Sequence, residues 1–128
     1  MTYYFSKSVN YNFDTAIANV TEELKKEGFG IITEIDIKDT YKKKLNVDFK
    51  KYRILGACNP NFAYQAILKE NKIGTMLPCN IIVQEHENGT VEVTAVDPVA
   101  SMMAVNNGSL ISLASQVREK LSKVIENL

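Results

Sequence analysis

Apolar residues recur along this chain with two different periods, and the two periods predict its secondary structure. Alternation of apolar and polar residues predicts strands over residues 3–9, 29–37 and 90–96, and apolar runs predict strands over residues 52–58 and 79–87. Apolar spacings of three and four predict the main helices over residues 13–27, 60–70 and 109–127. Shorter helical segments are expected over residues 37–45 and 99–105. The predicted order of the main elements is therefore β-α-β-(α)-β-α-β-β-α.

Turn residues mark the ends of these elements. Gly28 supplies the left-handed residue that stops the first helix. Asn59 can cap the helix that follows it, and Ser109 can cap the last helix. Asn88-Gly89 predicts a hairpin with a type I′ turn, because both central positions of that turn need positive φ.

Interleaved strands and helices predict an α+β fold, here a two-layer α/β sandwich of about five strands with helices on one face. A chain of 128 residues can bury its own core without a metal or a disulfide, so a single domain over residues 1–128 is expected. The strand pattern leaves Tyr4, Ile32, Leu55 and Ile82 on the face without helices. Because that face is apolar for a surface, we expect a homodimer that covers it.

Charge and composition narrow the classes of partner. Fifteen basic and fifteen acidic residues cancel, which removes a general attraction to nucleic acid or to an anionic membrane. We therefore expect no nucleic-acid partner and no membrane partner. The chain has no apolar window long enough to span a membrane, and its first residues do not resemble a signal peptide. Two cysteines in such a chain indicate free thiols and a cytoplasmic location.

The most unusual chemistry lies in two short motifs, Cys58-Asn59-Pro60 and Pro78-Cys79-Asn80. Each cysteine is followed by an asparagine at the junction of an apolar run and a turn signal. Asparagine amides, a phenol, a guanidinium and the free N–H groups of a helix start could together hold a small molecule or an anion. The residues predicted to bind this ligand are Arg53, Cys58, Asn59, Tyr64, Cys79 and Asn80.

Other readings of the same residues stay open. Cys58 precedes a helix N-terminus, which can lower a thiol pKa, so a thiol enzyme or redox protein with Cys79 as the resolving thiol is an alternative. A structural module that only dimerises is a further alternative. Cu(I) favours sulfur ligands, but methionines are mostly core fillers, and neither a metal nor a cofactor is predicted. His86, the single histidine, is expected at the surface, which gives little support to a Cys-His pair.

The chain also resembles a known family, catalogued as domain of unknown function 302. The residues that carry the resemblance are Tyr52 to Pro60, Phe62-Ala63-Tyr64, Gly74, and Leu77 to Val83, with residues 44–49 before them and Asp97-Pro98 after them. The resemblance covers nearly the whole chain. It implies a compact two-layer α/β fold and supplies no reaction, so no catalytic role passes from it to Cys58 or Cys79, and whether the protein is an enzyme is left open.

Overall fold

The computed structural model describes residues 2–128 and follows the predicted order of elements closely. The strands are β1 (Tyr4–Val9), β2 (Gly30–Asp36), β3 (Tyr52–Cys58), β4 (Cys79–Glu85) and β5 (Val91–Val96). The α-helices are α1 (Phe13–Lys26), α2 (Ile37–Leu45), α3 (Pro60–Lys69), α4 (Pro98–Ser101) and α5 (Ile111–Glu126). Short 3₁₀ turns η1 (Ile73–Met76), η2 (Met103–Val105) and η3 (Gly108–Leu110) complete the connections. The α+β sandwich is confirmed.

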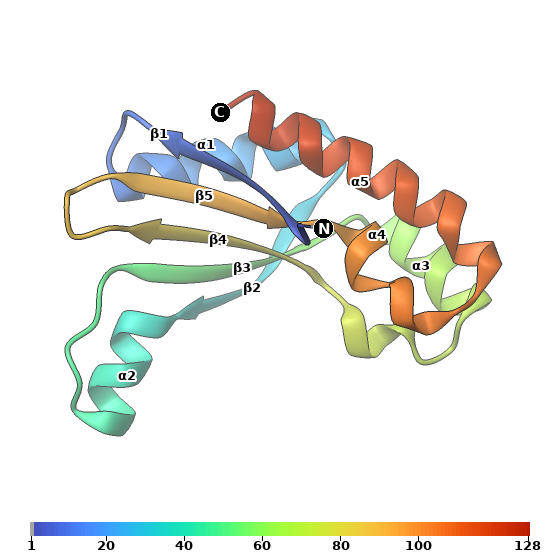
Figure 1. Cartoon of the computed structure of the whole chain (residues 1–128), viewed down its shortest axis with the longest axis horizontal. Coiled ribbons are helices and arrows are strands. Elements are labelled where there is room, and N and C mark those ends of the chain that lie inside the picture. Colours follow the sequence, from blue (N-terminus) through green and yellow to red (C-terminus); the bar gives the residue numbers. More distant parts are fainter. Residues whose placement is uncertain (1) are drawn as a thin grey trace.

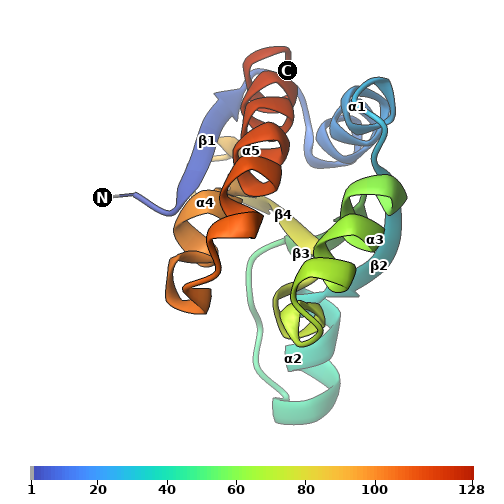
Figure 2. The ribbon, with the colours of Figure 1, turned by 90° about the vertical axis from the view of Figure 1, so that its right-hand side faces the viewer.

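The strands form one sheet in the order β1-β5-β4-β3-β2, and every neighbouring pair is antiparallel. The long helices α1 and α5 lie side by side on one face of this sheet (Figures 1 and 2). Helices α3 and α4 lie beyond one end of the strands, and α2 lies beyond the other end (Figure 1). We call the face that α1 and α5 leave uncovered the open face.

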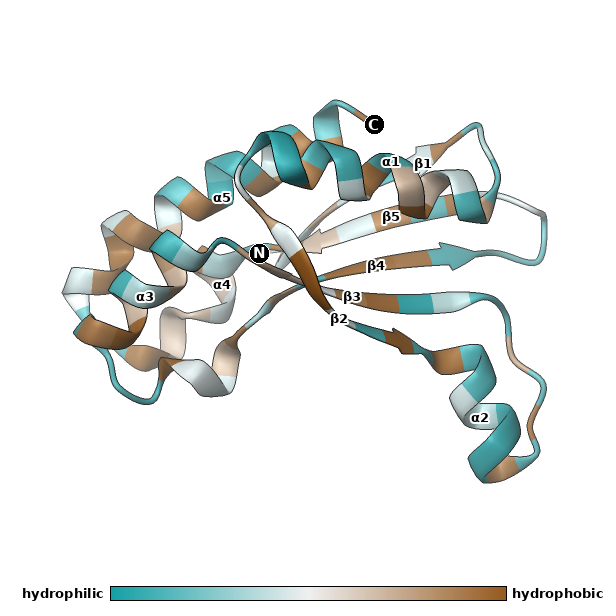
Figure 3. Cartoon of the chain, turned by 180° about the vertical axis from the view of Figure 1, so that it is seen from behind, coloured by the Kyte–Doolittle hydropathy of each residue, from teal (hydrophilic) through white to brown (hydrophobic). Residues whose placement is uncertain are grey.

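The core lies between the two long helices and the covered face of the sheet. Val20 and Leu24 of α1 and Leu121 and Val124 of α5 are fully buried there, against inward residues of the central strands such as Ile81. Burial of each such side chain contributes about 1.5–3 kcal/mol. Apolar residues dominate β3 and β4, whereas α2 is mostly polar (Figure 3). The long helices therefore hold the sheet in place, and α2 adds little to the core.

The predicted open face was wrong for Leu55. Leu55 is only 1% exposed, because it pairs with Ile81 on the helix-covered face. In β2, the pairing with β3 shifts between Ile31 and Thr33, which is a β-bulge. Ile32 is the extra residue of this bulge and is 61% exposed, and after it the alternation of faces in β2 is reversed. The homodimer expected from this face stays a prediction.

Two turn predictions also needed correction. Gly89 has a φ of 85°, but Asn88 does not lie at positive φ, so the hairpin turn is not type I′. The amide of Gly89 donates to the carbonyl of His86, and that of His86 donates to Thr90, which makes a three-residue loop with glycine at its left-handed position. The side chain of Asn107, not Ser109, accepts the capping hydrogen bond before α5, because a 3₁₀ turn precedes that helix.

Candidate functional site

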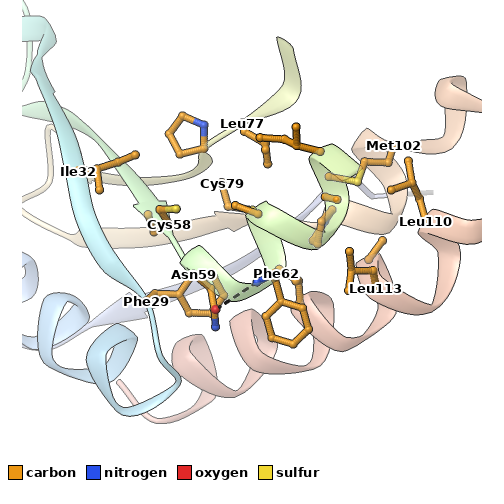
Figure 4. A pocket seen from close by; sticks show the side chains of 18 residues that line it. Phe29, Ile32, Cys58, Asn59, Phe62, Leu77, Cys79, Met102, Leu110 and Leu113 are labelled. Atoms are coloured by element: carbon orange, nitrogen blue, oxygen red, sulfur yellow. Dashed lines mark hydrogen bonds between the residues drawn. The ribbon is translucent and has the colours of Figure 1, made fainter. Parts of the chain in front are cut away.

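An apolar pocket of about 280 Å³ lies where the ends of β3 and β4 meet α3, α4 and α5 (Figure 4). Its walls are mostly hydrocarbon, and its polar groups are two thiols and one carboxamide. The lining residues are Phe29, Ile32, Ala57, Cys58, Asn59, Phe62, Ala63, Ala66, Ile67, Leu77, Pro78, Cys79, Pro98, Met102, Leu110, Leu113, Ala114 and Val117. The lining side chains, all within residues 2–128, carry no formal charge.

Small side chains create this space. Ala57 on β3, Ala63 and Ala66 on α3 and Ala114 on α5 all line the pocket. An alanine at a helix contact leaves a gap of several methylene groups where a leucine would fill it. The pocket is therefore a consequence of which residues occupy the facing positions of the helices and the sheet.

Both cysteines line the pocket from the ends of two neighbouring strands. Ala57 of β3 is the pairing partner of Cys79, the first residue of β4, and Cys58 is the last residue of β3, one position beyond this pair. Both thiols are free, with Cys79 buried and Cys58 half-buried. Burial raises the pKa of Cys79 to about 11, and the neighbouring Cys58 adds to this shift. Cys79 therefore stays a neutral thiol at physiological pH.

Asn59 holds the start of α3 in place beside the thiols. Its Oδ1 accepts a hydrogen bond from the backbone N–H of Phe62 at 3.5 Å, as predicted for an N-cap. Its Nδ2 donates to the carbonyl of Glu27 at 3.4 Å. This second contact ties α3 to the turn after α1, where Gly28 has a φ of 86°. One carboxamide thus links two helices at the edge of the pocket.

The structure places the other three predicted ligand residues elsewhere. The guanidinium of Arg53 lies 3.1 Å from Glu34 and 3.4 Å from Asp36, toward the far end of β3 from Cys58. Tyr64 is 66% exposed and is not part of the pocket lining. Asn80 follows Cys79 within a strand, so it lies on the open face. The predicted site is therefore brought together for Cys58, Asn59 and Cys79 only.

Sequence reasoning missed most of the pocket wall and the group that fixes one corner of it. Phe29, Leu113 and Val117 read as ordinary core residues, and nothing in their spacing separates pocket from core. Asp97 is buried: it accepts a hydrogen bond from Val99 N–H at 3.0 Å and another from Arg118 Nε at 3.0 Å. It thereby fixes the corner that presents Pro98 to the pocket.

Residues 2–128 contain neither a cluster of candidate metal ligands nor a helix suited to crossing a membrane. Within residues 2–128 no three His, Cys, Asp or Glu side chains come together as a candidate metal site. His86 lies near the hairpin, half-buried, and its Nε2 is 2.9 Å from Glu92 Oε1. Over the same residues, no helix combines the length and apolar character that crossing a membrane requires.

Comparison with known proteins identifies the family of this chain. A crystal structure of an uncharacterized conserved protein DUF302 from Bacillus stearothermophilus is similar, with a TM-score of 0.91 and 25% sequence identity over 98% of each chain. No curated protein matches the chain. The model of the family described as domain of unknown function DUF302 matches residues 5–128. The chain therefore belongs to the DUF302 family.

Proposed function

We propose that this protein binds a small, uncharged and mainly apolar molecule in the pocket beside Cys58 and Cys79. The pocket itself carries this proposal: an uncharged, largely hydrocarbon lining with a few polar groups at one side is typical of a small-molecule site. The anion considered from the sequence is disfavoured, because the nearest predicted cation, Arg53, is paired with two carboxylates away from the pocket.

The volume sets the size of the ligand. A cavity of about 150 Å³ in another protein binds benzene, and the present pocket of about 280 Å³ is nearly twice as large. By this ratio, the ligand contributes about ten to twelve carbon atoms to the interior. A medium-length alkyl chain or a two-ring aromatic group fits this description.

The β-bulge shapes the mouth of the pocket. Ile32 and Ile67 both line the pocket and are both exposed, so they lie at its opening. Without the extra residue in β2, alternation would not direct Ile32 to this position. An apolar ligand entering here would contact hydrocarbon from the surface inward, with Cys58 and Asn59 beside it.

A series of straight-chain alcohols tests this proposal. We expect binding, measured by calorimetry, to strengthen about fourfold for each added methylene until the pocket is full at about ten to twelve carbons. Ala63→Phe fills the pocket and should abolish binding of the long alcohols, whereas Ala18→Phe, the same change on the exposed side of α1, should leave it unchanged. Failure of any alcohol to bind, or equal affinity for all lengths, would contradict the proposal.

A dithiol redox protein is a second candidate, favoured because both free thiols line one pocket. In this reaction Cys58 attacks a small-molecule disulfide and releases one thiol, and Cys79 then displaces the second thiol to leave a Cys58–Cys79 disulfide. The high pKa of Cys79 disfavours the second step, since the resolving sulfur must ionise. Incubation with oxidised glutathione separates the candidates: a loss of two hydrogens in the protein mass supports the redox reading, and a stable glutathione adduct or no change argues against it.

A further inference from the structure

A second concave site lies on the open face of the sheet, away from the pocket at Cys58 and Cys79. It has a volume of about 550 Å³, which is within the usual range for ligand sites. Three tyrosines and several neutral polar side chains line it, and we call it the tyrosine groove. The lining residues used below are Tyr3, Tyr4, Tyr52, Asn80, Ile82 and Glu92.

The three tyrosines come from distant parts of the sheet. Tyr3 and Tyr4 lie at the β1 edge with their rings edge to face, 5.1 Å between centroids. Tyr52 lies on β3, and its ring packs against Phe49. Burial raises the pKa of Tyr52, and the phenols of Tyr3 and Tyr41 raise it further. A tyrosine hydroxyl can donate or accept a hydrogen bond, so the three phenols of the lining offer both functions to a ligand.

The one carboxylate in the groove is already engaged by protein groups. Ser6 Oγ donates to Glu92 Oε2 at 2.6 Å, and His86 Nε2 lies 2.9 Å from Oε1. These hydrogen bonds lower the pKa of Glu92, so the carboxylate is ionised and its charge is already solvated. The groove therefore does not require a cationic ligand to satisfy its charge.

Asn80 supplies the hydrogen-bonding group that the fold leaves unused. Its side chain is exposed on the groove floor and makes no hydrogen bond to any of the described residues 2–128. In the Pro78-Cys79-Asn80 motif, the side chains of Cys79 and Asn80 point to opposite faces of β4, so Cys79 lines the pocket and Asn80 lines the groove. The pocket hypothesis accounts for the cysteine of this motif and leaves its asparagine unexplained.

Flat aromatic rings beside neutral amide and hydroxyl groups match one class of ligand well. A sugar ring presents apolar C–H faces that pack against aromatic rings and hydroxyl edges that need donors and acceptors. We propose that the tyrosine groove is a second binding site and that it takes a neutral saccharide. A second copy of the chain fits it less well, because a symmetric contact would set one hollow against the same hollow and enclose unfilled space.

Titration with neutral disaccharides, cellobiose, maltose and chitobiose, tests this proposal by amide chemical-shift changes in the protein. We expect at least one of them to bind with millimolar affinity and to shift the resonances of β1, β4 and β5. Asn80→Ala should weaken this binding about fivefold, the usual effect of losing one hydrogen bond. Asn61→Ala, which changes an exposed asparagine on α3, is the matched control and should have no effect.

Two results would overturn the saccharide site. One is the absence of shifts on the open face with all three sugars. The other is a stable dimer in sedimentation that Ile82→Asp converts to a monomer, because a second copy would then occupy the groove. Neither result bears on the alcohol series, since the groove and the pocket lie on opposite faces of the sheet.

Discussion

The two Cys-Asn motifs look alike in the sequence and are used differently in the structure. In the first, Cys58 ends β3 and Asn59 caps α3, so both residues lie at the junction of these elements and both line one pocket. In the second, Cys79 and Asn80 both lie inside β4, and the alternation of a strand sends them to opposite faces. The Cys and Asn side chains therefore share one pocket where a strand meets a helix, and they point to opposite faces of the sheet where both belong to one strand.

The environments of the two thiols also differ. Cys79, the first residue of the central strand β4, is buried, whereas Cys58, the last residue of β3, is half-buried. Burial without a charged partner disfavours the thiolate, as the raised pKa of Cys79 shows. Position within the fold, more than neighbouring sequence, therefore sets the chemistry of each cysteine.

Inserting a side chain where β3 closely approaches Thr33 and Pro78 should have the largest effect on stability. Gly56 pairs with Asn80 and lies two residues before Cys58; a Cβ there would overlap the Thr33 side chain and come 2.7 Å from Pro78 Cγ. We expect Gly56→Val to lower the free energy of unfolding by about 3 kcal/mol, measured by urea denaturation.

Gly74→Val is the matched control, since a Cβ at Gly74 meets no atom within 4 Å. Its effect should stay within about 0.5 kcal/mol. A Gly56→Val protein as stable as the wild type would show that the β3–β4 contact tolerates a side chain, and the close approach would lose its structural importance.

The pKa of Cys79 predicts a loss of stability at alkaline pH. Its folded-state pKa of about 11 lies above the ordinary value of 9.0, so its contribution is fully present below pH 9 and is lost as pH rises toward 11. We expect a loss of about 2 kcal/mol across this window. The difference in unfolding free energy between the wild type and Cys79→Ala, measured at several pH values, isolates this group.

If that difference is constant between pH 9 and pH 11, burial does not raise the pKa of the Cys79 thiol.

Alkylation gives a second test of the difference between the two thiols. At pH 8 about one Cys79 thiol in a thousand is ionised, so iodoacetamide should modify Cys58 well before Cys79 in the folded protein. Peptide mapping after short exposure would show the order.

The smallest predicted effects come from the two asparagines. Asn59→Ala removes a helix cap and the contact with Glu27, and should lower the free energy of unfolding, measured by thermal denaturation, by about 1 kcal/mol. Asn80→Ala removes an exposed side chain without a hydrogen bond among residues 2–128, and should change stability by less than about 0.5 kcal/mol. Equal changes in the free energy of unfolding for the two variants would contradict the conclusion that Asn59 stabilises the fold and Asn80 does not.

The order of elements could be read from the sequence because the long helices and central strands have clear periods. Val20, Leu24, Leu121 and Val124 repeat at helical spacings and form the core as their pattern indicates. The faces of β2 and β3 could not be read reliably. One extra residue in β2 reverses its alternation without leaving a glycine or proline as a signal. β3 is apolar on both faces, so alternation does not assign Leu55. Local periodicity thus fixes elements better than it fixes faces.

The candidate site divides in the same way. Cys58, Asn59 and Cys79 could be grouped because both motifs lie where apolar runs meet turns. Strand alternation separates Asn80 from Cys79, although the similarity of the two motifs suggests one shared site. The pocket could not be foreseen, since it depends on alanines from β3, α3 and α5 that face one another only after folding.

The extra residue in β2 also bears on how copies of this chain behave when crowded together. β2 is an outer strand of the sheet, and such strands offer unpaired amides and carbonyls to any passing molecule. The shift between Ile31 and Thr33 interrupts the even spacing of those groups, which disfavours continuous pairing of another strand along this edge of the sheet. The β-bulge that places Ile32 at the pocket mouth thereby also disfavours edge-to-edge aggregation through β2.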